Sequence, residues 1–209
     1  MPVKSAPRVY RSSARSAAAD QTRARIIAAA RNLLGGSVDQ PAFSLDGVAR
    51  EAKVTRLTVY NQFVSKKGLL EAVFDDIARE GGLFELAAVM ATADADIALR
   101  RFVSVFCRFW ASNRSLMPKF HAVTQLDDDI AASLGQRRER RRQALTVLVK
   151  RLLPDAGRSA ADLVDVLFAL TGFEMYESLS VRQRSSRSIE TLIQALVEET
   201  VKRYRGGDD

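Results

Sequence analysis

SLDGVAREAKVTRLTVYNQFVSKKGLL, residues 44–70, contains two short amphipathic segments separated by a break of three residues. The first segment begins at Ser44, whose hydroxyl can accept a hydrogen bond from the free amides of a first helical turn. Its apolar residues recur at positions i, i+3, i+4 and i+7, which places them on one side of a helix: Leu45, Val48, Ala49 and Ala52. The sequence therefore predicts a two-turn helix from Ser44 to Ala52.

The second segment follows the break at Lys53 and Val54 and begins with Thr55 as its N-cap. Val59 and Phe63 lie four residues apart, so both can pack inward. The surface of this helix then carries side chains that can contact base edges in a DNA groove, namely Arg56, Leu57, Thr58, Tyr60, Asn61 and Gln62. A bidentate contact of Arg with guanine, or of Asn or Gln with adenine, discriminates by about 1–3 kcal/mol. The spacing predicts a helix-turn-helix, with Tyr60 positioning the helix through a phosphate.

A further helix is expected to begin with Ser65, Lys66 and Lys67. Two cations at a helix start oppose the usual preference for acids there. Two interpretations remain open: a nearby phosphate balances the lysines, or they are simply solvated.

Residues 22–75 resemble the DNA-binding domain of the tetracycline-repressor (TetR) family of bacterial regulators. The matching pattern consists of Leu45–Ala52, Val54-Thr55-Arg56, Thr58-Val59-Tyr60, Phe63, and Ser65-Lys66-Lys67 before Leu69-Leu70. The resemblance implies a set of residues lying against the DNA operator: Thr55, Arg56, Leu57, Thr58, Tyr60, Asn61 and Gln62. It also implies that Lys66 and the Ser44 end of the first helix contact backbone phosphates.

The chain departs from the family pattern at two positions. Lys53 occupies the turn where the family usually has glycine, and Gly47 lies inside the first short helix. A left-handed turn is costly without glycine, and glycine within a helix costs about 0.5–1 kcal/mol relative to alanine.

The positive charge of the chain is concentrated at the helix-turn-helix end. Residues 1–67 contain 12 Lys and Arg against 4 Asp and Glu, a balance of +8, whereas the other 142 residues contain 20 against 21, a balance of −1. Lysines and arginines that neutralise phosphates supply much of the sequence-independent affinity for DNA. This distribution favours double-stranded DNA as a partner.

With 209 residues, of which 47% are hydrophobic, the chain can bury a substantial core. It has no run of 18 apolar residues and no apolar segment typical of a secretory signal. A single cysteine, Cys107, fits a reducing compartment. We therefore expect a cytoplasmic protein with no membrane partner.

Three regions are expected along the chain. Residues 1–18, rich in Ser, Ala and Arg, are predicted to form a disordered basic arm, which either lies along DNA or is a solvated tail. Residues 19–66 are predicted to form the helix-turn-helix domain, in which a helix from Asp20 to Leu34 braces the two short ones. Residues 67–209 are predicted to form a helical regulatory and dimerisation domain.

Capping residues and Gly, Pro and Ser clusters divide the chain from residue 66 onward into helices. They are expected at Lys66–Glu80, Leu83–Ala91, Asp96–Asn113, Ser115–Leu126, Asp128–Leu153, Ser159–Leu179 and Ser188–Tyr204. The predicted fold is therefore all-α: an N-terminal three-helix DNA-binding domain followed by a helical bundle that binds a ligand and dimerises.

The last two expected helices carry broad apolar rows. A four-helix bundle formed with a second copy would bury them, as the resemblance also implies, and the candidate interface residues are Leu163, Leu167, Leu170, Ile189, Leu192 and Leu196. Alternatively, both rows complete the core of one protomer. A dimer would place two recognition helices on half-sites about 34 Å apart, or a multiple of that, and so predicts a palindromic operator.

The bundle is rich in aromatic and methionine residues, which could line a site for a small-molecule effector or simply pack the core. The candidate pocket residues are Phe102, Phe106, Trp110, Met117, Phe120, His121, Phe168, Met175 and Tyr176. His121 has no convergent partners for a metal, and we expect no metal and no cofactor. The run from Arg137 to Arg142 suggests a second nucleic-acid site, but we interpret it as a solvated helix face.

Together these features predict a homodimeric repressor that a small-molecule ligand releases from a palindromic operator. A nonspecific architectural DNA-binding protein would use the same basic region. A helical enzyme is disfavoured, because the single His and single Cys fall on different expected helices and the sequence has no glycine-rich phosphate loop.

Overall fold

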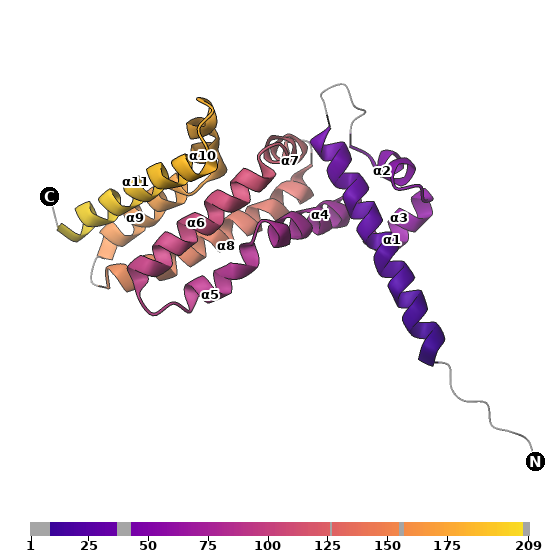
Figure 1. Ribbon diagram of the computed structural model, residues 1–209, viewed down its shortest axis with the longest axis horizontal. Helices are drawn as coiled ribbons and strands as arrows, with labels where there is room; N and C mark the ends of the chain where they lie inside the picture. Colours follow the sequence, from indigo (N-terminus) through magenta and orange to yellow (C-terminus); the bar gives the residue numbers. More distant parts are fainter. Residues whose placement is uncertain (1–8, 37–42, 126, 155–156, 207–209) are drawn as a thin grey trace, which may run out of the picture. The chain divides into compact units, whose positions relative to one another are not determined.

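The computed structural model describes residues 9–36, 43–125, 127–154 and 157–206, without the side chains of residues 9–15 and Thr124. All regular structure in these residues is helical, which confirms the predicted fold class. The chain divides into two compact units, one ending at Phe74 and one beginning at Asp75 (Figure 1).

Unit 1 is built from α1 (Val9–Gly35), α2 (Leu45–Glu51), α3 (Arg56–Phe63) and the first half of α4 (Lys66–Glu80). Helix α2 packs against both α1 and α3. Apolar side chains from all four helices are buried: Ile26, Ala29, Ala30, Leu34, Val48, Ala49, Ala52, Val59, Phe63, Leu69, Leu70, Ala72 and Val73. This burial gives two short helices, which would not be stable alone, a fixed position.

Helix α1 is longer than the sequence pattern suggested. It begins at Val9, so residues 9–18, expected to belong to a disordered arm, are helical, while residues 1–8 lie outside the described residues. No Gly or Pro lies between Val9 and Leu34, and Ala17, Ala18 and Ala19 have the highest helix propensity. Once burial holds the residues around Ile26 in a helix, each preceding residue needs only propagation, which is far cheaper than nucleation.

The boundary between the units also differs from the expected one. It falls after Phe74, within α4, and not after residue 66. Leu69, Leu70 and Val73 are almost fully buried. The first half of α4 is therefore part of the compact N-terminal unit.

Unit 2 contains the second half of α4 and the remaining helices. These are the 3₁₀ helix Leu83–Glu85, α5 (Leu86–Met90), α6 (Ala95–Asn113), α7 (Met117–Thr124), α8 (Asp128–Leu152), α9 (Gly157–Leu170), α10 (Phe173–Ser180) and α11 (Ser186–Gly206).

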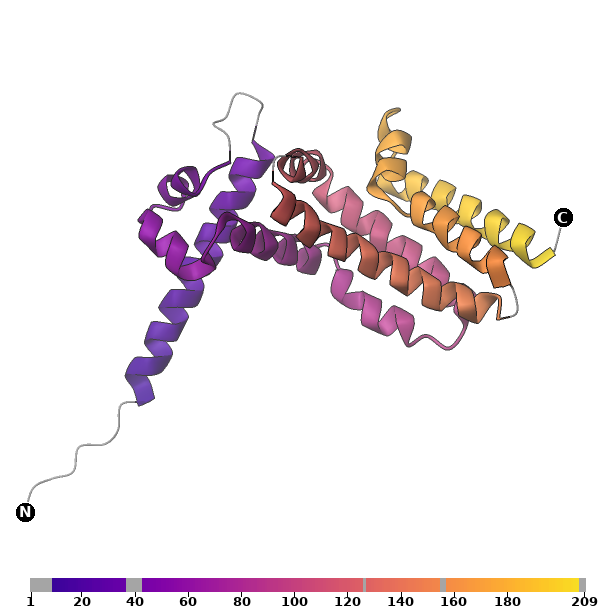
Figure 2. The same cartoon turned by 180° about the vertical axis from the view of Figure 1, so that it is seen from behind.

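Four long helices form the body of unit 2 (Figures 1 and 2). Helix α6 packs on α8, α8 on α9, α9 on α11, and α11 on α6, so the four close a bundle. Its core is continuous and takes buried residues from all four, among them Phe102, Leu148, Leu163 and Ile193. Helix α5 packs on α6, and α7 packs on α8.

The segment predicted as one helix from Ser159 to Leu179 is broken in the structure. Helix α9 ends at Leu170, and α10 begins after Gly172, whose backbone is extended (φ −77°, ψ 163°). A buried arginine on α8, Arg141, donates from Nη1 to the carbonyl oxygen of Phe168 and to Oγ1 of Thr171, both at 2.9 Å. The first bond satisfies a carbonyl oxygen at the end of α9 that a continuing helix would use itself.

The arginine run on α8 is only partly a solvated face. Arg138 and Arg140 are exposed as expected, whereas the side chain of Arg141 is buried. Helical geometry explains the difference, because Arg141 is four residues before Leu145 and seven before Leu148, both core residues, and so shares their face.

Gly68 allows α4 to begin close to the end of α3. A Cβ atom at this position would lie 2.3 Å from the carbonyl oxygen of Phe63, a backbone atom that cannot rotate away. The amide of Gly68 donates to Oγ of Ser65 at 3.0 Å and thereby caps the new helix. Glycine is therefore required here by space.

We predict that Gly68→Ala lowers the thermal unfolding temperature, because the methyl group forces α3 and α4 apart. The matched control is Gly135→Ala, since Gly135 lies within α8 with no other atom within 4 Å of the added Cβ. That substitution should stabilise the protein by about 0.5–1 kcal/mol through helix propensity. Circular dichroism on heating measures both variants, and a Gly68→Ala protein as stable as the wild type would contradict the proposed clash.

Candidate functional site

The helix-turn-helix forms with the two N-caps that the sequence predicts. Oγ of Ser44 accepts a hydrogen bond from the amide of Gly47 at 3.1 Å and begins α2. Oγ1 of Thr55 accepts one from the amide of Thr58 at 3.1 Å and begins α3. Both hydroxyls therefore hold helix ends, in addition to any contact they make with a phosphate.

The turn between α2 and α3 contains a strained residue. Lys53 has φ of 53°, in the left-handed region, at the position where the sequence lacks the usual glycine. This conformation costs an L-residue about 1–2 kcal/mol, and the packing of α2 and α3 offsets the cost.

Helix α3 separates its inward and outward residues as the sequence predicts. Val59 and Phe63 are buried, and Leu57 and Tyr60 are 66% and 54% exposed. Of the other predicted DNA contacts, Thr55, Arg56 and Asn61 are exposed, and Thr58 and Gln62 are half-buried. The exposed face thus brings together hydrogen-bonding, cationic and apolar side chains of the kinds that contact bases and phosphates.

Two cations of this region have partners within unit 1. Nη1 of Arg56 lies 3.3 Å from Oδ2 of Asp46, and both side chains are well exposed. Such a surface ion pair is worth little, so Arg56 can exchange Asp46 for a base or phosphate at small cost. Lys66, in the first turn of α4, has Nζ 5.7 Å from the ring centroid of Phe43.

Arg23 on α1 is a structural residue that the sequence analysis did not identify. Its Nη1 donates to the carbonyl oxygen of Gln62 at 3.0 Å, and its guanidinium carbon lies 4.4 Å from the ring centroid of Phe63. These contacts hold the end of α3 against α1. Nothing in the sequence separates Arg23 from the other arginines nearby, because only the folded arrangement places it beside Phe63.

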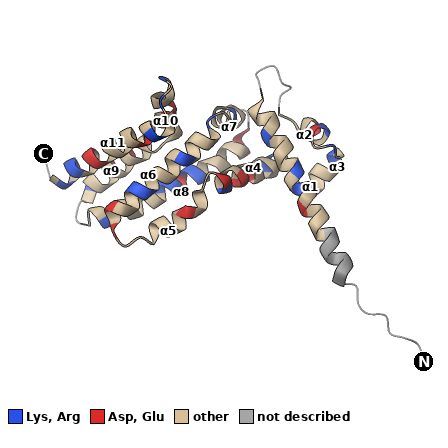
Figure 3. Ribbon diagram, in the orientation of Figure 1, with Lys and Arg blue, Asp and Glu red and all other residues tan. Residues whose placement is uncertain are grey.

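Charge is distributed differently in the two units. Lys and Arg predominate along α1 and around α2 and α3, where a few acidic residues also lie, whereas the helices of unit 2 carry both signs throughout (Figure 3). Arg50, Lys53 and Arg56 are exposed at the helix-turn-helix. This concentration of cations next to the exposed face of α3 suits a polyanionic partner.

In unit 2, some of the predicted pocket residues form a connected aromatic row. Ring centroids are 4.7 Å apart for Phe102 and Phe106, and 6.0 Å apart for Phe106 and Trp110. Phe173, which was not among the predicted pocket residues, continues the row at 5.7 Å from Trp110. Phe168 joins it through Arg141, whose guanidinium carbon lies 3.9 Å from the Phe168 ring centroid and 5.7 Å from that of Phe106.

The other predicted pocket residues occupy different environments. Met117, Phe120 and Tyr176 are buried, and Met175 is half-buried. His121 is exposed and has its ring edge-on to Phe173 at 6.0 Å between centroids, so it lies at the outer end of the row. The expectation that His121 lines an enclosed pocket is not supported.

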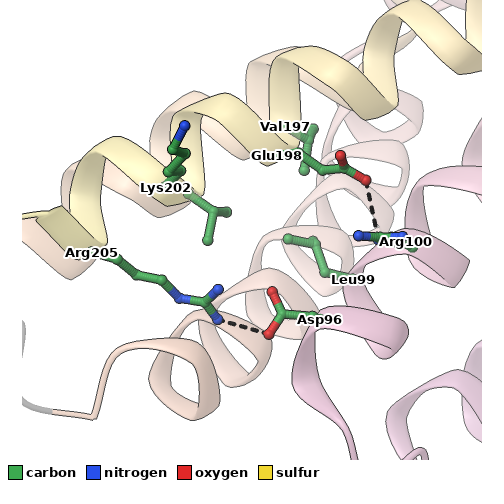
Figure 4. Close-up of a pocket in the computed structure, with 8 residues that line it drawn as sticks. Asp96, Leu99, Arg100, Val197, Glu198, Lys202 and Arg205 are labelled. Atoms are coloured by element: carbon green, nitrogen blue, oxygen red, sulfur yellow. Dashed lines mark hydrogen bonds and ion pairs between the residues drawn. The ribbon is translucent and has the colours of Figure 1, made fainter.

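A cavity of about 260 Å³ lies elsewhere, between α6 and α11 (Figure 4). It has these lining residues, which were not among the predicted pocket residues: Asp96, Leu99, Arg100, Val197, Glu198, Val201, Lys202 and Arg205. Two ion pairs connect the helices around it: Arg205 Nη2 to Asp96 Oδ2 at 2.8 Å, and Arg100 Nε to Glu198 Oε1 at 3.1 Å.

The candidate dimer interface needs correction. Leu163, Leu167 and Ile189 are buried in the core of the protomer and cannot face a second copy, and Leu170 is half-buried. Leu192 and Leu196 are 38% and 43% exposed, and Val166 on α9 is 37% exposed. The predicted rows combined two faces of the same helices, because both faces are apolar and periodicity does not tell an inner face from an outer one.

The environment of the single cysteine suppresses its reactivity. Cys107 is buried in α6, and burial, aided by the nearby charge of Glu190, raises the pKa of its thiol to about 12. The reactive thiolate is then scarce at neutral pH. In the described part of the chain, no three His, Cys, Asp or Glu side chains gather as a metal site would require.

Among the described residues, no helix has both the length and the apolar character needed to span a membrane.

A two-helix motif with an exposed polar helix in a basic region defines a helix-turn-helix DNA-binding protein. Residues 26–73 match the family model of bacterial regulatory proteins of the tetR family. The match covers the helix-turn-helix and its supporting helices, so this part of the chain is similar to the DNA-binding domain of that family. No curated protein matches it.

Solved structures share the fold over nearly the whole chain. A TetR-like transcriptional regulator from Rhodococcus sp. RHA1 has a TM-score of 0.65 and 15% identity, with 90% of this chain and 97% of that one covered. A putative TetR-family transcriptional regulator from Mesorhizobium loti MAFF303099 has a TM-score of 0.60 and 17% identity, with 88% and 96% covered. The fold thus extends the likeness beyond the helix-turn-helix into unit 2.

The role of Arg23 leads to a stability prediction. Arg23→Gln should lower the free energy of unfolding by about 1–2 kcal/mol, because it removes the bond to the Gln62 carbonyl and the contact with the Phe63 ring. Arg25→Gln is the control, since Arg25 is exposed on the same helix and should change little. Urea unfolding measures both, and equal effects would show that Arg23 does not brace α3.

Proposed function

We propose that this chain is a homodimeric repressor that binds a palindromic operator and is released from it by a small-molecule effector. The observation that carries the proposal is the presentation of α3, whose apolar side is anchored by Val59 and Phe63 while Arg56, Tyr60 and Asn61 face solvent. The basic surroundings of α3 and the match of residues 26–73 to the tetR family model support it.

In this proposal, the residues of α3 divide their roles between bases and backbone. Arg56, Asn61 and Gln62 hydrogen-bond to base edges, while Leu57 and the methyl group of Thr58 contact thymine methyl groups. A second group binds phosphates and sets the position of the helix: Ser44, Thr55, Tyr60 and Lys66.

Two copies are proposed to meet through the outer faces of α9 and α11. Val166, Leu192 and Leu196 are exposed there, with the small residues Ala169 and Ala195 beside them in the helical repeat. A two-fold axis would pair this surface with itself, as in most homodimers. The same axis would set the two α3 helices on half-sites of a palindrome.

The effector is proposed to bind within unit 2 and to prefer a dimer geometry in which the α3 helices no longer match the half-sites. Only a difference in affinity between the two geometries can release the DNA. The aromatic row from Phe102 to Phe173 is the candidate surface for it.

The proposed function is tested by selecting bound duplexes from a randomised pool and then competing the best sequence against unrelated DNA. A repressor should select a palindrome and bind it at least about 10³-fold more tightly than unrelated duplex at physiological salt. A ratio near one would instead indicate a nonspecific architectural protein.

We predict that the proposed base contacts and phosphate contacts respond differently to substitution. Arg56→Ala and Asn61→Ala should relax base preference at single operator positions, each by about 1–3 kcal/mol. Lys66→Ala should weaken binding to all sequences alike and reduce the salt dependence by about one unit of slope. Lys150→Ala, an exposed position on α8, is the control. Altered base preference with an unchanged salt slope in Lys66→Ala would refute these roles.

We also predict that Leu192→Glu and Leu196→Glu produce folded monomers that bind the selected operator weakly, because each places a charge in the proposed interface. Val147→Glu is the matched control, since Val147 is similarly exposed on α8, away from this surface. Sedimentation gives the oligomeric state. Dimers in all three variants would exclude the proposed interface.

A further inference from the structure

Arg141 is a buried cation that makes no direct contact with a carboxylate of the described residues. It lies on α8 with only 9% of its surface exposed. Its neighbours in the arginine run differ, since Arg137 pairs with Asp75 and Arg142 pairs with Asp165. Burying a charge without a counter-ion is expensive, and an apolar residue of similar size would normally be more stable there.

The protein occupies only one part of the Arg141 guanidinium. Nη1 donates to the Phe168 carbonyl oxygen and to Thr171 Oγ1, both at 2.9 Å. Within the described residues, Nε and Nη2 of Arg141 have no acceptor, although a guanidinium has five N–H groups to donate. In the same residues, Gln194 Oε1 is the one side-chain N or O atom that is fully buried and has no hydrogen-bond partner. Nε and Nη2 of Arg141 lack a partner but are not fully buried, so this edge of the guanidinium is accessible.

Arg141 keeps its charge in this position. Burial lowers its pKa to about 10, and the nearby positive charges of Arg138 and Arg142 act in the same direction, while Glu174 acts against it. A pKa of about 10 leaves the group protonated at neutral pH. The site therefore presents a permanent positive charge in a poorly solvated environment, where an anion would be held strongly.

Aromatic side chains surround this charge. The guanidinium carbon lies 3.9 Å from the Phe168 ring centroid and 5.7 Å from that of Phe106. Thr171 connects it to Trp110, because Trp110 Nε1 donates to the Thr171 carbonyl oxygen at 3.0 Å. A fixed cation and a cluster of packed aromatic rings thus meet where α8, α6 and the end of α9 come together.

From this arrangement we infer that the effector is an aromatic carboxylate whose carboxylate group binds Nε and Nη2 of Arg141. The planar guanidinium edge matches the two oxygens of a carboxylate in a bidentate pair. The ring of the ligand would lie against Phe106, Phe168 and Trp110, with favourable offset or edge contacts. The inference rests on the proposed effector function and specifies the chemical class of the ligand.

The test uses the full chain and three carboxylates, benzoate, cinnamate and indole-3-acetate, each paired with its primary amide. Amide and carboxylate have nearly the same shape and differ in charge, so the comparison isolates the contribution of Arg141. At least one carboxylate should raise the unfolding temperature and bind at least tenfold more tightly than its amide in calorimetry. The same carboxylate should weaken binding to the selected operator.

Variants then locate the carboxylate. Arg141→Gln should lose at least tenfold in carboxylate affinity and leave amide affinity unchanged, and Arg141→Lys, which keeps the charge without the fork, should show an intermediate loss. Arg140→Gln is the matched control, because Arg140 is exposed on the same helix. Lys202→Gln tests the alternative cavity between α6 and α11. Arg140→Gln and Lys202→Gln should both bind the carboxylate as tightly as the wild type does.

Several results would overturn the inference: no response of the wild type to any of the three carboxylates, equal binding of carboxylates and amides, or loss of binding in Lys202→Gln. Retention of carboxylate binding in Arg141→Lys and Arg141→Gln would also overturn it. If Arg141→Gln does not fold, the inference is tested by the carboxylate affinity of Arg141→Lys and by the difference between carboxylate and amide affinity in the wild type. Operator selection by the wild type is measured separately, so failure of the ligand class leaves the DNA-binding proposal standing.

Discussion

The packing of Val59 and Phe63 into the core of unit 1 is the constraint on which the presentation of α3 depends. An eight-residue helix has too few internal hydrogen bonds to persist in water, so its orientation must come from its buried side. Arg23 adds a second anchor, because it holds the Gln62 carbonyl and covers the Phe63 ring. With one side held in this way, the proposed DNA-contacting side is already oriented before binding, which reduces the ordering cost of binding.

In unit 2, a cluster of hydrogen-bonded side chains fixes the junction between α9 and α10. Arg141, Thr171 and Trp110 meet where α9 stops and α10 begins, and Arg141 and Trp110 donate to the Phe168 and Thr171 carbonyl oxygens that the break leaves free. An apolar core alone would have allowed the helix to continue. The break thus sets the direction of α10 and leaves one edge of a buried guanidinium available to a ligand.

The sequence predicted local features well and pairings between distant segments poorly. The caps at Ser44 and Thr55 and the inward placement of Val59 follow from spacing within a few residues, and the structure confirms them. In contrast, Arg141 was predicted on a solvated helix face, and Leu163 and Ile189 were predicted at a subunit interface, whereas all three are buried within the protomer. Each depends on which neighbouring helix covers which face, and this information is spread over segments far apart in the chain.

The sequence by itself determined the helical periodicity, the helix-turn-helix spacing and the concentration of positive charge in the first 67 residues. These are properties of short segments, fixed by backbone geometry and side-chain type. The tertiary structure alone decided that Arg23 braces α3, that α9 ends at Leu170, and that Leu192 faces outward while Ile189 faces inward. The reason is that burial belongs to the assembled helices, and an apolar stripe does not specify its own partner.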